Sequence, residues 1–260
     1  MDPANVALLV AAGLAAGTVN AIAGGGSLIT FPALLATGLA PVPANVTNSI
    51  AVVPGYLASV AGSRTDLADL VKEGRRRELL ALVPTAALGS AAGCVLLLAT
   101  PARAFEIVVP FLVLAAAVAL AFQPQLRRLV GHAHERRHPT LGLHLVVGAG
   151  AVYGGYFGAA LGVMLVAALG LVLDTRLARI AALKNAVSAV VGLVTVVAFG
   201  VFGPVDWVDV AVLAPATVTG GYLGARIARR LPAAVLRVLI VTFGGIIGLV
   251  LLWRAFTETR

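Results

Sequence analysis

Charged side chains are scarce in this chain: Asp, Glu, Lys and Arg make up only 12% of its 260 residues, whereas soluble domains carry roughly 25%. Residues 79–99 contain no charge at all, and about 20 apolar residues in a helix are enough to cross the ~30 Å hydrocarbon core of a bilayer. This pattern excludes an ordinary water-soluble protein and indicates a polytopic membrane protein. The formal net charge of +8 therefore bears on membrane orientation, and nucleic acid is not an expected partner.

Residues that could perform covalent or redox chemistry are equally few. The single cysteine, Cys94, excludes an intrachain disulfide and a cysteine-rich metal site. The sequence has neither the H-E-x-x-H motif of metalloproteases nor the G-x-S-x-G motif of serine hydrolases. We therefore expect a protein that is not an enzyme, with no catalytic residue, no metal and no cofactor.

Acidic residues are absent from the middle of the apolar segments. Asp and Glu fall at or near predicted segment ends and loops, as Glu106, Asp174 and Asp209 do. A proton or sodium relay ordinarily uses carboxylates inside the membrane. Coupling of transport by that route is therefore not supported.

The apolar residues cluster into segments that predict membrane helices. Two of these segments, 28–38 and 161–173, are short enough to suit half-spanning or broken helices, or re-entrant hairpins with their predecessors. We predict an all-α polytopic membrane protein with roughly eight to ten membrane segments. The segments lie near 5–22, 28–38, 43–62, 79–99, 105–122, 141–158, 161–173, 180–202, 209–225 and 233–253.

Basic residues concentrate in three of the connecting loops, 63–78, 123–139 and 226–230. Loops rich in Lys and Arg resist translocation and stay cytoplasmic. We therefore expect these loops on the cytoplasmic face and both termini outside.

The two halves of the chain share a pattern. Each has a glycine-rich stretch (17–27 and 150–162), then a short apolar segment, then A-N-V-T-N (44–48) or A-A-L-K-N (181–185) at the start of a longer one. In the expected orientation the first half of the chain begins outside the cell and the second half begins on the cytoplasmic side. This predicts two inverted-topology repeats around a transport site. We predict a first membrane repeat at 1–125, a basic cytoplasmic linker at 126–139 and a second membrane repeat at 140–260.

A glycine cluster marks the first candidate site. Gly24, Gly25 and Gly26 lie before Ser27, between a full-length apolar segment and a short one, and each glycine lowers helix stability by about 1 kcal/mol. A helix that starts at Ser27 would present unpaired N–H groups and a positive dipole end to an anionic oxygen. A flexible bend or close helix packing is the alternative.

Three further polar residues lie in otherwise apolar stretches, where a side-chain amide without a partner costs roughly 1–3 kcal/mol. They are Asn20, Thr47 and Asn48. They are candidates to bind a ligand, and hydrogen bonding between helices or capping of a helix is the alternative.

Lys184 is the most informative single residue because it lies inside an apolar helix, where the first half has Thr47. Its charge must be accommodated, either as the fixed positive charge of an anion site or by reaching the cytoplasmic interface, which Arg179 marks. Asn185 matches Asn48 in the same pattern and is also a candidate.

Glycines spaced four residues apart are interpreted as close-packing faces between membrane helices. The pairs include Gly13 with Gly17, Gly89 with Gly93, and Gly158 with Gly162.

Several of these motifs occur together in one order: A-G-T-V-N-A-I-A-G-G-G-S at 16–27 within a longer match over 12–35, A-N-V-T-N-S-I-A-V-V-P-G at 44–55, Y-G-G-Y-F-G-A-A-L-G at 153–162, A-A-L-K-N at 181–185 and G-G-Y-L-G-A-R-I-A-R-R-L-P at 220–232. In this the chain resembles the sulfite exporter TauE/SafE family, also called the 4-toluene sulfonate uptake permease family. Where many members have three glycines in the second half, this chain has Gly158-Ala159-Ala160, which predicts a less open second break.

The resemblance implies a multi-pass carrier in a bacterial or archaeal plasma membrane that moves a small sulfur-containing anion. We predict export of sulfite or an organosulfonate, with Asn20, Gly24, Gly25, Gly26, Ser27, Thr47, Asn48, Lys184 and Asn185 as the binding residues. A passive anion channel, and a membrane enzyme or accessory protein of sulfur metabolism, are the alternatives. The expected partners are the anion and the lipid bilayer, and the sequence leaves homodimerisation open.

Overall fold

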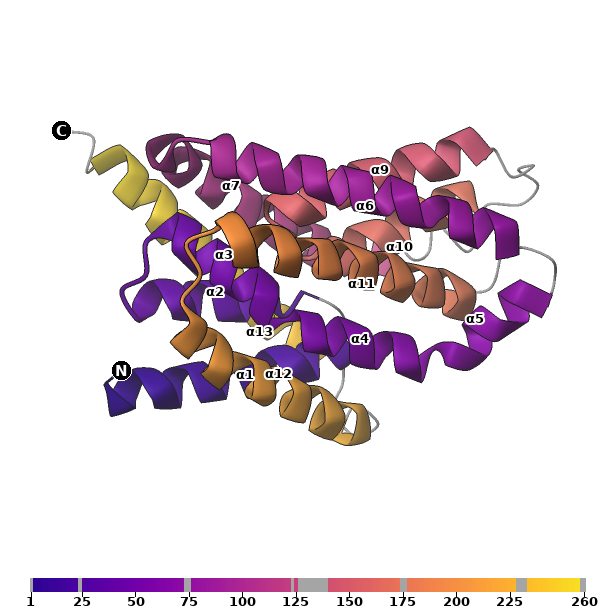
Figure 1. The fold of residues 1–260 in the computed structure, drawn as a ribbon. Helices are drawn as coiled ribbons and strands as arrows, with labels where there is room; N and C mark the ends of the chain where they lie inside the picture. The colour runs from indigo at the N-terminus through magenta and orange to yellow at the C-terminus, as the bar shows by residue number, and fades with distance from the viewer. Residues whose placement is uncertain are drawn as a thin grey trace.

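The computed structural model describes residues 2–22, 25–72, 76–122, 124–125, 140–173, 177–227 and 233–257. In these ranges every regular element is a helix, so the prediction of an all-α polytopic membrane protein is confirmed. The helices are α1 (Pro3–Ile22), α2 (Ser27–Ala36), α3 (Pro41–Ala51), α4 (Val53–Gly62), α5 (Arg64–Leu70), α6 (Arg76–Ala99), α7 (Ala102–Ala121), α9 (Thr140–Tyr156), α10 (Leu161–Val172), α11 (Leu177–Phe202), α12 (Trp207–Ile227) and α13 (Ala233–Thr257) (Figure 1).

Among the described helices, 5 are long and apolar enough to cross a bilayer by length and composition. They contain Pro3–Asn20, Leu79–Ala99, Ala102–Ala121, Arg179–Phe202 and Val238–Thr257. Large apolar side chains on their outer faces are exposed, among them Leu88 at 72% and Phe202 at 76%. Soluble monomers rarely expose so much contiguous apolar surface, and these faces therefore suit contact with lipid.

Each predicted apolar segment is found as a helix, with one correction. Segment 43–62 is interrupted at Val52, so that it forms two helices, α3 and α4. The cause is Pro54, which has no N–H to donate to the carbonyl of Ile50 and whose ring disfavours a continuous helix. The short helix α5 then follows α4 directly.

The two short segments fold back on their predecessors. Helices α1 and α2 form one hairpin and α9 and α10 another, and the two hairpins enter the molecule from opposite ends (Figure 1). Gly25, with φ of +103°, lies in the first turn, and Gly158, with φ of +72°, lies in the second. Both turns lie inside the molecule, as broken helices of transporters do.

The first helix of each half packs along a helix of the other half. Helix α1 lies along α12, where a Cβ built on Gly17 would come within 2.1 Å of the carbonyl oxygen of Thr217. Helix α9 lies along α6, where a Cβ built on Gly93 would come within 2.1 Å of the carbonyl oxygen of Val152. Both glycines are therefore the close-packing positions that their spacing predicted. The inverted relation of the halves, and their boundaries, stay predictions.

The start of α1 and the end of α13 lie at the same end of the molecule (Figure 1). The junction of α4, α5 and α6, which carries Arg64 and Arg76, lies at the opposite end. The predicted linker 126–139 lies outside the described residues. Which end is cytoplasmic stays a prediction.

Candidate functional site

The two hairpin turns meet at a small cavity, here called the central cavity. Its volume is about 20 Å³, enough to hold a water molecule. Both halves of the chain contribute to it, through the two hairpin turns and through helices α4 and α11. The lining residues are Asn20, Gly25, Ser27, Tyr56, Ser59, Gly158, Ala160, Leu161, Gly162, Lys184 and Ser188.

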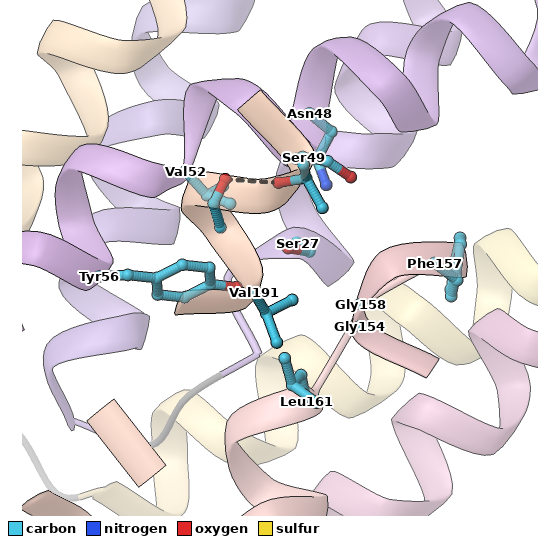
Figure 2. A pocket seen from close by; sticks show the side chains of 12 residues that line it. Ser27, Asn48, Ser49, Val52, Tyr56, Gly154, Phe157, Gly158, Leu161 and Val191 are labelled. Atoms are coloured by element: carbon cyan, nitrogen blue, oxygen red, sulfur yellow. Dashed lines mark hydrogen bonds between the residues drawn. The ribbon is translucent and has the colours of Figure 1, made fainter. Parts of the chain in front are cut away.

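A second cavity of about 10 Å³ adjoins the first and shares Ser27, Tyr56, Gly158 and Leu161 with it. Figure 2 shows Ser27, Asn48, Tyr56 and Gly158 around this adjoining cavity. Because cavities of about 20 and 10 Å³ are too small for a sulfur oxyanion, such a ligand could enter only after the hairpins or their neighbours move.

Asn20 and the glycines build the first turn. The Asn20 Oδ1 atom accepts a hydrogen bond of 2.8 Å from the Gly26 N–H, and a Cβ on Gly26 would come within 2.5 Å of the carbonyl oxygen of Ala16. Gly25 and the buried Ser27 line the central cavity, whereas Gly26 shapes the turn behind it. Gly24 lies outside the described residues.

The second turn is as sharp as the first, although it contains alanines. Ala160 has φ of +55°, a left-handed conformation that costs an L-residue roughly 1–2 kcal/mol. The Tyr153 hydroxyl donates a hydrogen bond of 2.6 Å to the Ala159 carbonyl and ties the turn to α9. The chain breaks at this turn and Leu161 begins a new helix, and that this second break is less open than the first stays a prediction.

Two helix N-termini consequently converge on the central cavity, that of α2 at Ser27 and that of α10 at Leu161. The Leu28 and Leu161 N–H groups already donate to the Gly25 and Gly158 carbonyls of their own turns, so these helix ends act on an anion mainly through the helix dipole, which is positive at the N-terminus. Together they create a site that favours an anion.

Lys184 adds a full positive charge to these partial charges. Its side chain lies over the start of α10, where a Cβ built on Gly162 would be 3.3 Å from Lys184 Cδ and 3.6 Å from Nζ. The side chain lines the central cavity and is half-buried. This position matches the anion-site interpretation better than an extension along lipid to the interface.

The remaining candidates divide between cavity and scaffold. Asn48 lines the adjoining cavity, where its Oδ1 accepts a hydrogen bond of 2.5 Å from Thr30 Oγ1. Thr47 lines neither cavity. Its Oγ1 accepts a hydrogen bond of 3.0 Å from the Asp206 N–H. Asn185 lines neither, and its Nδ2 donates to Ser63 Oγ at 2.6 Å. Hydrogen bonding between segments, the alternative interpretation, thus describes Thr47 and Asn185.

Sequence reasoning missed three polar lining residues: Tyr56, Ser59 and Ser188. A signal was present, because Ser59 follows Tyr56 by three residues and Ser188 follows Lys184 by four. Residues at these spacings share one helix face.

Buried aromatic side chains pack beside the cavities, and one of them, Phe157, lines the adjoining cavity. Phe31 of α2 and Phe157 of α9's turn pack edge to face at 5.4 Å between ring centroids, and Phe105 of α7 packs against Tyr156 at 5.8 Å. Phe31, Phe105 and Phe157 are fully buried.

The geometry of the second turn makes a testable prediction. Gly158→Ala should lower the free energy of unfolding by about 1–2 kcal/mol, because an L-residue is strained at this φ and its Cβ would lie 3.0 Å from the Gly154 carbonyl oxygen. Gly55→Ala is the matched control, since a Cβ there meets nothing within 4 Å. Thermal unfolding in detergent measures both, and equal stability of the two variants would contradict the turn geometry.

Known proteins resemble this chain over most of its length. Residues 9–251 match the family described as Sulfite exporter TauE/SafE. A "Probable membrane transporter protein" of Haemophilus influenzae is 29% identical over 238 residues, covering 91% of this chain and 90% of the relative. The "Probable membrane transporter protein YfcA" of Escherichia coli K12 is 28% identical, covering 89% of this chain and 82% of the relative. No solved structure was found to match.

Proposed function

The chain belongs to the sulfite exporter TauE/SafE family, and on that basis we propose that it is a secondary transporter that exports a small sulfur-containing anion, sulfite or an organosulfonate. It is a multi-pass plasma-membrane protein and acts in a lipid bilayer. Its relatives are named as membrane transporters, which agrees with transport as its function.

One observation carries the choice of an anion: Lys184 lies where the N-termini of α2 and α10 converge. None of the described residues that line the central cavity is acidic. A cation would meet one full and two partial positive charges there, whereas an anion would be stabilised by all three.

The polar neighbours support an oxyanion in particular. Ser27, Ser188 and Tyr56 carry hydroxyl groups and Asn20 an amide, all of which can donate hydrogen bonds to several oxygens at once. A sulfite or sulfonate group presents three such oxygens in a compact volume. The glycines at 25, 158 and 162 let backbone approach the ligand closely.

The membrane potential favours export. An anion that leaves a negative-inside cell gains about 2.3 kcal/mol per charge per 100 mV. Export therefore requires no coupling ion, in agreement with the absence of mid-segment carboxylates from the sequence. Uptake of the same anion would require one.

Purified protein should be stabilised by its substrate. We expect one of sulfite, thiosulfate, sulfate, sulfoacetate and taurine to raise the unfolding free energy by about 2.7 kcal/mol at 100 times its dissociation constant. Taurine should stabilise less than sulfoacetate, because its ammonium group would lie near that of Lys184. A thermal-shift panel with choline as a cationic control measures this, and stabilisation by choline alone would reject an anion site.

Flux in proteoliposomes tests transport itself. Saturable sulfite efflux that accelerates with an inside-negative potential, together with counter-transport, is the expected result. Flux that rises linearly with concentration and shows no counter-transport would identify a channel. The absence of flux for every sulfur oxyanion would reject the proposed substrate class.

A further inference from the structure

A larger pocket, here called the arginine pocket, lies apart from the central cavity and shares no lining residue with it. Its volume is about 200 Å³. It lies between the end of α2, the first turns of α7 and the last turns of α13. Arg103 and Arg254 supply two positive charges from two different helices, and Glu106 supplies one negative charge.

The two arginines are available to a ligand. Glu106 Oε2 lies 3.8 Å from Arg103 Nη1, too far for a hydrogen bond. The side chains of Arg103 and Glu106 are 52% and 40% exposed, and Arg254 is exposed as well. An ion pair this long and this accessible to solvent contributes little, so the Arg103 guanidinium can bind another anion.

The rest of the pocket is apolar and continues onto lipid-facing surface. Leu35, Leu39 and Leu251 form part of its wall. Ile107 on α7 also lines the pocket and is partly exposed outside it, and Leu249 on α13 is another exposed large apolar side chain. Trp253 and Phe256 flank Arg254 and are exposed too. Tryptophan is typical of the boundary between the bilayer and water, which places the pocket at the depth of lipid headgroups.

We propose that the arginine pocket binds an anionic phospholipid, with the phosphodiester at Arg103 and Arg254 and an acyl chain along the exposed apolar faces of α7 and α13. Guanidinium groups match phosphate oxygens in bidentate geometry. On the cytoplasmic side of membranes, basic pockets between transmembrane helices bind anionic headgroups, and Arg103 and Arg254 offer the same chemistry at the end of the molecule where α13 ends. A free phosphate or sulfonate has the same oxyanion chemistry, but the apolar wall and its continuation favour the lipid.

Native mass spectrometry of the purified full-length protein tests this with phosphatidylglycerol as the probe and phosphatidylcholine as the zwitterionic comparison. We expect at least tenfold preferential retention of phosphatidylglycerol. The Arg103→Gln, Arg254→Gln double variant should lose this preference. Glu106→Gln should increase it, because the pocket then carries one negative charge fewer.

The matched control is the Arg64→Gln, Arg76→Gln double variant, which removes two exposed arginines at the opposite end of the molecule. It should retain the preference, and both double variants are first checked for wild-type melting temperature. Equal loss in both would show a general charge effect and overturn the site. Wild-type retention in the Arg103, Arg254 variant would overturn it as well. Displacement of the lipid by inorganic phosphate at equal concentration would assign the pocket to a free oxyanion and reject the lipid.

Discussion

Lys184→Met is expected to weaken binding of the best anion by about 10- to 150-fold, because it removes a charge-assisted contact worth roughly 1.5–3 kcal/mol. Methionine has a similar length and no charge, so the half-buried side chain can still pack over Gly162 and the protein should fold and insert. Lys184→Arg keeps the charge and should be partly tolerated. Binding and transport, normalised to the amount of inserted protein, measure the effect.

The chain offers a matched control in its other lysine, Lys72. The Lys72 side chain is 77% exposed, and its Nζ lies 3.5 Å from Asp69 Oδ1, so Lys72→Met removes the same charge far from the cavity. We expect it to leave the affinity unchanged. Wild-type affinity in Lys184→Met would show that this lysine does not bind the substrate. Its charge would then reach the membrane interface and help to set how deeply α11 lies in the bilayer.

The helices could be predicted because the bilayer imposes a length on them. A segment of about 20 apolar residues is long enough to cross as one helix, and of the predicted segments of about that length only 43–62 is divided into two. The segments at 28–38 and 161–173 were too short for that rule. Their length suits a broken helix that crosses the membrane as well as one that folds back as a re-entrant hairpin. Only the packing of α2 against α1 and of α10 against α9 decides for the hairpin. The break at Val52 had a signal in Pro54, but membrane helices also tolerate proline as a mere kink.

The candidate site could be predicted where a residue conflicts with its surroundings. Lys184 carries a charge in an apolar helix, and the glycines near Gly25 interrupt one. Ser59 produces no such conflict, because its hydroxyl can bond within its own helix, as it does to the Gly55 carbonyl at 2.8 Å. Its place at the cavity follows from the two hairpins, which no local pattern contains.

Thr47 and Asn185 were predicted as binding residues, but the structure pairs them with other segments of the chain. As polar residues in apolar stretches they present the same sequence signal as Asn48 and Lys184. Their partners, Asp206 and Ser63, lie 159 and 122 residues away in the chain. A partner at that separation leaves no trace in a single sequence. The pattern therefore identifies residues that need a partner without distinguishing a ligand from another helix.

The largest effect on stability is expected where α6 and α9 pack closely against each other, a contact here called a helix seam. Gly93→Val should lower the unfolding free energy by about 3 kcal/mol or more, because overpacking costs 1–3 kcal/mol even where side chains can adjust. Here the new Cβ would lie 2.1 Å from the Val152 carbonyl oxygen and 2.8 Å from the Tyr156 nitrogen, and backbone atoms cannot move aside singly. At roughly 2–4 °C per kcal/mol, the melting temperature should fall by about 6–12 °C.

Gly245→Val is the control, because this glycine also lies in a long apolar helix, α13, and a Cβ there meets nothing within 4 Å. An equal loss of stability in both variants would mean that valine itself, and not the helix seam, is responsible. Gly17→Val tests the corresponding seam between α1 and α12, where the Cβ would also come within 2.1 Å of a carbonyl oxygen. If the two seams are equivalent, its melting temperature should fall by a similar amount, and a double variant of Gly17 and Gly93 should combine both losses because the seams share no residue.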